Sequence, residues 1–215
     1  KKINKSKLTS PDIISLHKEL QKLKEKKIEN VIIEASSHGL HQGRLEGINF
    51  RAGIFTNFTQ DHLDYHKSMK NYLNAKLILF NKLLKKKSYI ILDENNKEFI
   101  KLKKIAKKRK LKIISITKQS NCKEINNSKL VGEFQIKNLL MAILAGKLSM
   151  LKDKKIYSVL NQIQPINGRL SLTRILPNNT KVFIDYAHTP DALENSLKTL
   201  KNYYKTNITL VFGCG

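Results

Sequence analysis

Short apolar runs alternate with segments of helical periodicity along most of the 215-residue chain. Apolar runs bounded by turn residues are typical of buried strands, whereas apolar residues that recur every three or four positions are typical of helices. The pattern predicts strands at Val31–Ala35, Ala52–Asn57, Tyr89–Asp93, Lys112–Thr117, Lys181–Tyr186 and Ile208–Phe212. It predicts helices at Asp12–Lys26, Ser68–Leu84, Asn96–Lys108, Gln135–Leu151, Lys154–Gln162 and Pro190–Tyr203. This alternation favours an α/β fold with a mainly parallel sheet flanked by helices.

Turn and capping residues divide the chain further. The sequence Ser10-Pro11-Asp12 is typical of a helix start, with Ser10 as the cap and Pro11 at the first helical position, and Thr189-Pro190 repeats the pattern. Pro, Asn and Gly gather within Gln164–Gly168, as they do in connections between domains. We therefore expect one domain over residues 1–167 and the beginning of a second, Rossmann-like domain over residues 168–215.

Several side chains that can bind metals follow two of the predicted strands. Glu34 closes the run VIIE, and Asp61 and His62 follow the run AGIFTN closely. In open α/β sheets, ligands bind beyond the carboxyl ends of the strands, so these side chains are predicted to share one site. The presence of histidine by itself favours zinc over Mg²⁺, because Mg²⁺ prefers oxygen ligands.

Lys76 interrupts the apolar stripe of a predicted helix. The stripe recurs at helical spacing and consists of Met69, Tyr72, Leu73, Leu77, Phe80 and Leu84. A lysine on such a stripe has two interpretations. Its stem can lie on the core while its amine reaches water, or the buried amine can lose its charge or find a partner.

Composition excludes some classes of function. The formal net charge is +24, but the excess is mostly lysine spread along the chain, with only five arginines and no aromatic-interleaved basic motif. A specific nucleic-acid-binding protein is therefore the weaker alternative, and weak polyanion binding is expected as a side effect. No apolar run of about 18 residues predicts a membrane span, and no secretory signal is visible. Cys122 and Cys214 lack metal-finger spacing, which indicates a reduced, cytoplasmic setting.

The motifs of the chain, in order, resemble those of the Mur ligases, the ATP-dependent amino-acid ligases of peptidoglycan synthesis, and among them the type that adds the third residue of the peptide. SSHGL, DYAHTPDAL and FGCG form the most specific combination. The matching segments are LTSPD at 8–12, EASSHGLHQGR at 34–44, FTNFTQDHLDYH at 55–66, NAK at 74–76, GEFQIKNLLMAILAG at 132–146, NGR at 167–169, DYAHTPDAL at 185–193 and VFGCG at 211–215.

The resemblance implies a cytoplasmic, monomeric enzyme of cell-wall synthesis. Its substrates would be UDP-N-acetylmuramoyl-L-alanyl-D-glutamate, an amino acid and ATP, and its product a new amide formed through an acyl phosphate. The third residue, meso-diaminopimelate or L-lysine, stays open because the selecting motif is absent. Other Mur-type ligases and folylpolyglutamate synthases are the enzymatic alternatives, against which the SSHGLHQGR run argues.

The resemblance also assigns a metal centre. It implies that Glu34 binds one Mg²⁺, that His62 binds a second, and that Lys76 is carbamylated by CO₂, which would turn a buried cation into an anion. In this family pattern the metal is magnesium, not zinc. Asp61 and Asp64 are expected to support the ligands or to start a helix, and His41 and His66 to be exposed.

Further residues match substrate and nucleotide contacts of the family. The implied substrate-binding residues are Thr9, Ser10, Ser36, Gln42 and Arg44, and the implied nucleotide-binding residues are Asn138, Arg169, Asp185 and His188. Helix capping by Thr9 and Ser10, or a plain strand end and capped helix at DYAHTP, are the structural alternatives. Two departures stand out, since Phe134-Gln135 replaces a usual Phe-Asn and Ala35 replaces a usual valine.

We expect that these 215 residues alone do not catalyse ligation. The sequence contains no G-x-x-x-x-G-K-[ST], the loop whose backbone N–H groups and lysine hold the β- and γ-phosphates of a nucleotide. The measurement is ATP-dependent amide formation by the isolated chain, for which we expect no turnover. Measurable turnover would contradict the interpretation of the chain as part of a longer ligase.

Overall fold

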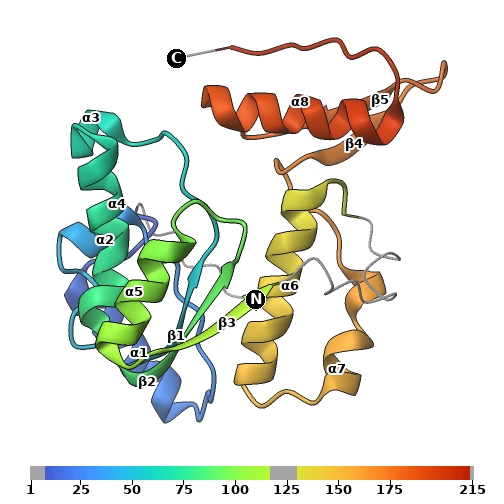
Figure 1. Ribbon diagram of the computed structural model, residues 1–215. Coiled ribbons are helices and arrows are strands. Elements are labelled where there is room, and N and C mark those ends of the chain that lie inside the picture. The colour runs from blue at the N-terminus through green and yellow to red at the C-terminus, as the bar shows by residue number, and fades with distance from the viewer. Residues whose placement is uncertain (1–7, 117–129, 214–215) are drawn as a thin grey trace. The chain divides into compact units, whose positions relative to one another are not determined.

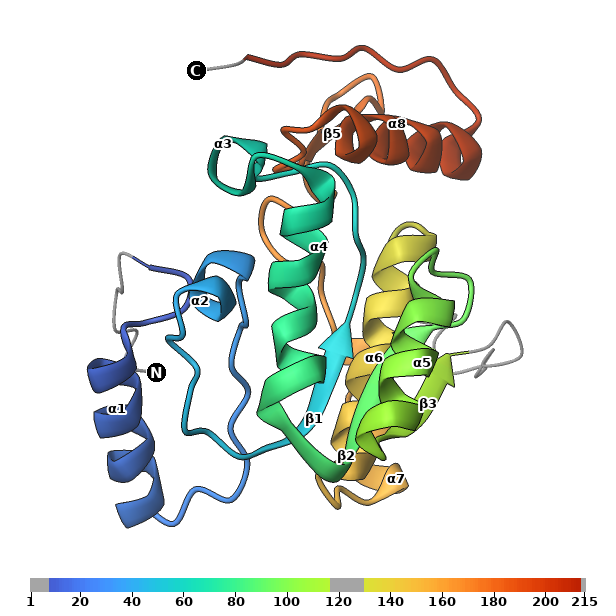
Figure 2. The same cartoon turned by 60° about the vertical axis from the view of Figure 1, so that its left-hand side comes forward.

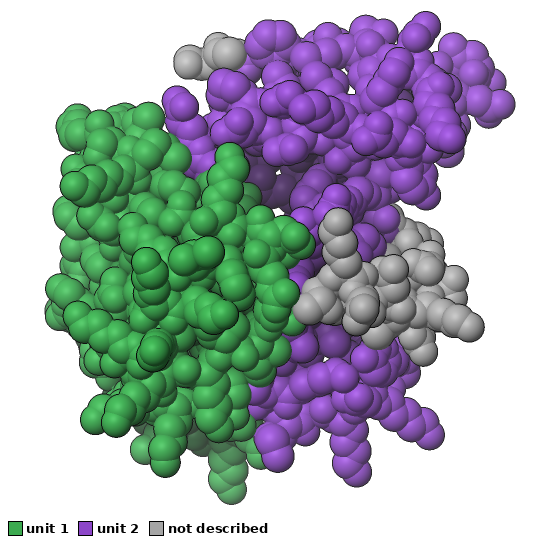
Figure 3. Space-filling view, in the orientation of Figure 1, with its two compact units in different colours: residues 1–58, 62–115 green, residues 59–61, 116–215 purple. Residues whose placement is uncertain are grey.

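The computed structural model describes residues 8–116 and 130–213 of the chain. The chain groups into two compact units, coloured separately in Figure 3. Unit 1 comprises residues 1–58 and 62–115, and unit 2 comprises residues 59–61 and 116–215. The boundary that the sequence suggests between residues 167 and 168 stays a prediction. None of the helices in the described ranges is long and apolar enough to cross a membrane.

Unit 1 is built on a three-stranded sheet (Figure 1). Its strands are β1 (Phe50–Phe55), β2 (Leu84–Asp93) and β3 (Lys112–Ile116), in the order β1-β2-β3. β1 pairs with β2 in parallel, and the helix α5 (Phe99–Arg109) connects β2 to β3, as a crossover between parallel strands requires. The α/β class with a mainly parallel sheet is therefore confirmed.

The helices of unit 1 agree with the periodic segments of the sequence and add two short ones. Besides α5, the helices are α1 (Ile13–Glu25), α2 (Ser37–His41), α3 (Leu63–His66), α4 (Met69–Ile78) and the π-helical turn η1 (Leu79–Leu83). α2 and α3 were not predicted because five and four residues are too few to establish a periodicity. Figure 2 shows α2 beside α4, and residues of the two helices are in contact.

The start of α1 differs from the prediction. Asp12 is the N-terminal cap, and its side chain accepts a hydrogen bond from the Ser15 backbone N–H at 2.9 Å. Ser10, the predicted cap, precedes this helix and is fully buried. At α8 (Pro190–Tyr204) the prediction is confirmed, because Thr189 caps the helix through the Ala192 N–H and proline occupies its first turn.

The core of unit 1 lies between the sheet and the helices. Leu84, Ile90, Leu92 and Leu102 are completely inaccessible to solvent, and they pack with the stripe of α4 and η1. Tyr72, Leu73, Leu77 and Phe80 on that stripe are all buried, as their spacing predicted. Burial of this stripe fixes which side of α4 faces the sheet.

The ladder between β1 and β2 contains a large bulge. Phe50 pairs with Leu84, but the next pair joins Ala52 to Tyr89, so the segment 85–88 lies opposite a single residue of β1. The Ser88 hydroxyl donates to the Phe50 carbonyl at 2.9 Å, and the Lys87 N–H donates to the Lys110 carbonyl at 2.9 Å. Bulges bend a strand and turn its side chains away from the regular ladder.

Four predicted elements differ from the observed ones, and one of them, Lys154–Gln162, forms a helix over Asp153–Tyr157 and a separate 3₁₀ turn over Leu160–Gln162. Val31–Ala35 and Ile208–Phe212 form no strand, and Ile32 and Val211 are 95% and 92% exposed. A strand requires a neighbour for its backbone N–H and C=O groups, and no described strand pairs with either run. The helix predicted over Ser68–Leu84 ends as α4 at Ile78 and continues as η1, which leads directly into β2.

Unit 2 combines helices with a two-stranded sheet. Its elements are α6 (Glu133–Leu148), α7 (Asp153–Tyr157), the 3₁₀ turn η3 (Leu160–Gln162), β4 (Ser171–Ile175), β5 (Lys181–Ile184) and α8. β4 and β5 are antiparallel, and β4 was not predicted. A second core joins Leu139, Ile143, Ile156 and Leu160. The predicted segments 52–57, 96–108, 135–151, 181–186 and 190–203 all overlap observed elements of the same type.

Replacement of Leu102 by alanine should destabilise unit 1 strongly. Leu102 is 0% exposed, so Leu102→Ala leaves a cavity and should lower the free energy of unfolding by about 2–5 kcal/mol. Ile100 lies on the same helix but is 66% exposed, and Ile100→Ala should change the stability by about 0.5 kcal/mol or less. Urea unfolding of both variants provides the measurement, and equal losses would contradict the assignment of the α5 core face.

Candidate functional site

The buried hydroxyl of Ser10 joins two segments that are distant in sequence. Ser10 Oγ donates a hydrogen bond to the Glu34 carbonyl at 2.8 Å and accepts one from the Ser36 backbone N–H at 3.1 Å. It also lies 3.0 Å from Ser36 Oγ. Three of the predicted site residues are therefore brought together at one oxygen atom, although the contact to Glu34 is through its backbone. The exposed carboxylate of Glu34 is accessible to a ligand.

Ser36 starts the short helix α2. Its side chain accepts a hydrogen bond from the Gly39 N–H at 3.1 Å, which satisfies one of the backbone donors at the helix start. Gly39 faces Ser10 so closely that a Cβ atom would lie 2.7 Å from Ser10 Cβ. Glycine is therefore required at this position, since no larger residue fits between α2 and the Ser10 segment.

Arg44 fixes the same region from its other side. Its Nη1 donates to the Ser10 carbonyl at 3.0 Å, and its Nη2 donates to Gln42 Oε1. Gln42 Nε2 in turn donates to the Tyr65 hydroxyl at 3.0 Å, and His41 Nδ1 lies 2.9 Å from the same hydroxyl. The predicted substrate residues Ser10, Ser36, Gln42 and Arg44 thus form one network, beside which Thr9 is exposed. Sequence analysis did not identify Tyr65, which links this network to α3.

A cluster of aromatic rings lies next to this network. The His38 ring centroid is 4.9 Å from that of His62, 4.2 Å from that of Tyr65 and 5.3 Å from that of His66. His66 stacks on Tyr72 at 5.3 Å, and the His62 centroid lies 5.7 Å from the Tyr72 centroid. We name His38, His41, His62, Tyr65, His66 and Tyr72 the ring cluster.

The expectation that His66 is exposed is wrong. His66 is only 5% exposed, and its Nε2 lies 3.0 Å from the Ser37 hydroxyl. Burial lowers the pKa of His66 below its ordinary value of 6.5, and the positive charges of His38, His41 and His62 lower it further. His66 ends a four-residue helix, which is why no periodic signal in the sequence indicated its burial.

Tyr72 brings His62 and Lys76 to the same place. Lys76 is half-buried on α4, between the buried Ala75 and Leu77. Its Nζ lies 5.3 Å from the centroid of the Tyr72 ring, which is also in contact with the exposed His62. The partial burial of Lys76 agrees with its place on the apolar stripe and permits either of the two interpretations of that place.

The predicted ligands Glu34, His62 and Lys76 carry a carboxylate, an imidazole and an amine. Among residues 8–116 and 130–213, no three His, Cys, Asp or Glu side chains gather in a way that could hold a metal ion. Glu34 provides carboxylate oxygens, and a carbamate on Lys76 would add the hard oxygen donors that Mg²⁺ prefers. Asp64 occupies the first turn of α3, which agrees with its predicted role at a helix start.

The predicted nucleotide residues of unit 2 surround Tyr186. The Asp185 carboxylate accepts hydrogen bonds from the Leu170 N–H at 3.2 Å, the Tyr186 N–H at 2.9 Å and the Ser196 hydroxyl. The Arg169 guanidinium lies 5.2 Å from the Tyr186 ring centroid, and His188 Nδ1 lies 3.0 Å from the Tyr186 carbonyl. Arg169, Asp185 and His188 are therefore neighbours.

Gln135 connects this group to α6. It is buried, and its Nε2 donates to the Arg169 carbonyl at 3.1 Å. The predicted nucleotide residue Asn138 is exposed and follows Gln135 by about one helical turn. The glutamine that appeared as a departure from the family pattern thus holds α6 against the Arg169 segment. Asp61, also in unit 2, lies 3.7 Å from His188 Nε2.

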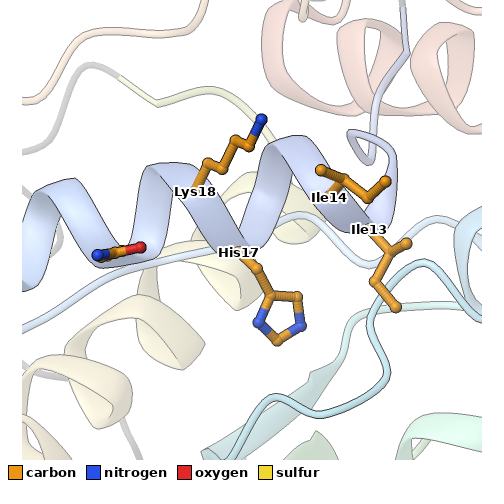
Figure 4. A pocket seen from close by; sticks show the side chains of 5 residues that line it. Ile13, Ile14, His17 and Lys18 are labelled. Carbon is orange, nitrogen blue, oxygen red and sulfur yellow. The ribbon is translucent and has the colours of Figure 1, made fainter.

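An open cleft along α1 contains none of the predicted residues. It has a volume of about 610 Å³ and is lined by Ile13, Ile14, His17, Lys18 and Gln21 (Figure 4). His17 Nε2 lies 2.9 Å from the Glu46 carbonyl, so this histidine has a structural contact. The side chains of this cleft do not form a catalytic arrangement.

Comparison with known proteins agrees with these motifs. The family model of the Mur ligase middle domain matches residues 1–146. The chain belongs to the Mur ligase family. A second model, described as the Mur ligase, glutamate ligase domain, matches residues 168–215. The family identified from the sequence motifs is therefore confirmed.

Curated Mur ligases resemble the chain over its whole length. A protein of Rickettsia bellii is 36% identical over 97% of the chain, and one of Buchnera aphidicola subsp. Schizaphis graminum is 39% identical over 98% of it. Both are named UDP-N-acetylmuramoyl-L-alanyl-D-glutamate--2,6-diaminopimelate ligase. The chain covers 48% and 47% of these proteins, so it spans about half the length of the relatives that it matches.

Solved structures of Mur ligases share the fold. A structure titled UDP-N-acetylmuramoyl-L-alanyl-D-glutamate--2,6-diaminopimelate ligase is 26% identical, with a TM-score of 0.69 over 89% of this chain and 44% of the other. A MurF structure from Acinetobacter baumannii is 15% identical, with a TM-score of 0.59 over 73% of this chain and 38% of the other. The second likeness concerns the fold alone.

The stability of unit 1 should depend on pH through His66. Its pKa is lower in the folded chain, so the unfolded chain binds the proton more readily as the pH falls below 6.5. The free energy of unfolding should therefore decrease from pH 6.5 downward, until the pH lies below the folded-state pKa. The full stabilisation should be present above pH 6.5.

Two variants separate this effect from other titrations. His66→Gln should flatten the pH dependence of urea unfolding, whereas His17→Gln, at an exposed histidine, should keep it. NMR titration of the His66 ring gives the folded-state value directly. A pKa at or above 6.5 would show that burial does not disfavour the charged form.

Proposed function

We propose that this chain is the central part of an ATP-dependent ligase that acts on UDP-N-acetylmuramoyl-L-alanyl-D-glutamate and adds the third amino acid. The observation that carries the proposal is the hydrogen-bonded network of Ser10, Ser36, Gln42 and Arg44. This network joins the LTSPD and SSHGLHQGR motifs, and the relatives that match almost all of the chain bear the name of this ligase.

The third amino acid that we propose is 2,6-diaminopimelate. The motif that would distinguish it from lysine is absent, so the proposal rests on the names of the relatives, of which eight between 32% and 39% identical all include 2,6-diaminopimelate. We also propose that the reaction takes place in the cytoplasm, where the nucleotide-linked precursor and ATP are available.

The sugar–peptide substrate would bind at the network. Thr9 is exposed beside the buried Ser10, whose hydroxyl holds Ser36 at the start of α2. The Arg44 guanidinium can form paired hydrogen bonds with a carboxylate or phosphate. Its present bonds to Ser10 and Gln42 would hold it in position for that contact.

The metal and the carbamate would lie beside the ring cluster. Glu34, His62 and carbamylated Lys76 would hold Mg²⁺, which neutralises phosphate charge when bound. Tyr72 supports this assignment because its ring contacts both His62 and Lys76. A carbamate would also replace the half-buried cation by an anion that Mg²⁺ could neutralise.

Residues of unit 2 would bind the nucleotide. Asn138, Arg169, Asp185 and His188 would provide contacts to ATP, with Asp185 fixed by three donors and Arg169 placed against Tyr186. In the reaction, the D-glutamate side-chain carboxylate attacks the γ-phosphorus of ATP, and ADP leaves. The incoming amine then attacks the acyl phosphate, and the tetrahedral intermediate loses phosphate to form the amide.

Lys76→Arg in the full-length protein tests the carbamate. Guanidinium cannot be carbamylated and stays cationic, so the variant should lose activity by roughly 10² or more, since it would repel the metal rather than hold it. Lys76→Ala should be nearly inactive, and added acetate should restore part of the activity. The measurement is amide formation by wild type and variants in bicarbonate-free and bicarbonate-containing buffer.

A lysine that only packs on the core gives the opposite result. Arginine would then be tolerated, and removal of CO₂ would not change the wild-type rate. Lys70 lies on the same helix and is exposed, so Lys70→Arg is the matched control and should keep full activity. Full activity of Lys76→Arg in bicarbonate-free buffer would remove the carbamate from the mechanism.

A further inference from the structure

A second open cleft in unit 1 is lined mainly by cations. It has a volume of about 620 Å³, and we name it the basic cleft. It lies where the bulge of β2 and the end of α5 meet the segment before β1. Its lining residues are Gly47, Ile48, Asn49, Lys82, Leu83, Leu84, Lys85, Lys86 and Arg109.

No described carboxylate balances the charge of the basic cleft. Four of its lining residues carry positive charge, and none is acidic. Lys82, Lys85 and Lys86 are exposed, and no described carboxylate forms an ion pair with them. Cations that share one concave surface repel one another, and a concave surface concentrates their field. A bound anion would relieve that repulsion.

Two features hold these cations in place. Arg109 Nη2 donates to the carbonyls of Lys82 at 3.2 Å and of Leu84 at 2.8 Å, so the guanidinium is fixed against the backbone. Residues 85–88 form the bulge and do not pair regularly with β1. Hydrogen bonds from Ser88 to the Phe50 carbonyl and from the Lys87 N–H to the Lys110 carbonyl fix the bulge. Lysines presented from a fixed backbone lose less entropy on binding than lysines on a mobile segment.

We propose that the basic cleft binds a small anion with several phosphate groups. Its volume lies within the range of small-molecule sites, and four cationic residues along one cleft match the charge of a triphosphate better than that of a single phosphate. The cleft is lined by nine residues only, which favours a small ligand over a polymer that would need a basic groove extending across the surface. None of the lining residues belongs to the proposed ligase site, so the proposal does not depend on that function.

Calorimetric titration tests the proposal. The 215-residue chain is titrated with inorganic triphosphate, pyrophosphate and phosphate, at about 0.15 M salt and without Mg²⁺. We expect saturable binding with one triphosphate per chain and an affinity that rises with the number of phosphates. The double variant Lys82→Glu/Lys86→Glu should weaken triphosphate binding by about tenfold or more, because it removes two charge-assisted contacts.

The matched control is Lys101→Glu/Lys104→Glu, at two exposed lysines of α5 outside the cleft. Both double variants change the formal net charge by −4, from +24 to +20. The control should keep triphosphate affinity within about twofold of wild type. Equal losses in both variants would overturn the proposal, because binding would then follow the net charge of the whole chain.

Two further measurements use the wild-type chain and do not depend on the folding of a variant. NMR shifts of the wild-type chain on addition of triphosphate should be largest at residues 82–86 and 109. Shifts spread over lysines elsewhere, or no saturable binding, would overturn the proposal. Short duplex DNA should compete poorly with triphosphate at the same salt, and tight competition with a steep salt dependence would indicate a polymer as the ligand instead.

Discussion

The arrangement of the candidate site depends on one buried hydroxyl. Ser10 Oγ holds the Glu34 carbonyl and the Ser36 N–H at once, across 24 and 26 residues of sequence. A buried polar group without its partners destabilises a protein by about 1–3 kcal/mol, so each of these groups stabilises the position of the others. Because Ser36 caps α2, and α2 packs on α4, the position of Lys76 is linked to the same oxygen.

The ring cluster places a different constraint on the site. Four of the six histidines of the chain lie within it, and burial together with the charges of its histidine neighbours lowers the pKa of His66, the most buried of the four. Neutral rings can pack at the observed centroid distances, whereas several imidazolium ions in the same volume would repel one another. The close packing of these rings therefore opposes protonation of His66.

The sequence predicted features that depend on local pattern. Burial of Tyr72, Leu73 and Leu77 followed from helical spacing, and the cap of α8 followed from Thr189-Pro190, because both are set within one or two turns of chain. The sequence did not predict features that depend on partners distant along the chain. The run Val31–Ala35 has strand composition but no ladder, and Ser10 resembled a cap before the structure placed it beneath α2. Of the candidate site, the sequence indicated residues that the structure brings together, such as Ser10, Ser36 and Arg44, but not the connecting roles of Tyr65, Tyr72 and Gln135.

The direct passage from α4 through η1 into β2 contains no loop residue. An α-helix turns by about 100° for each residue, so one residue inserted or deleted between Lys76 and Leu84 would rotate the lysine by that angle relative to the sheet. The junction thus sets the rotation of α4 about its own axis relative to the sheet. A chain that keeps Lys76 and His62 at the Tyr72 ring therefore has a fixed number of residues between α4 and β2.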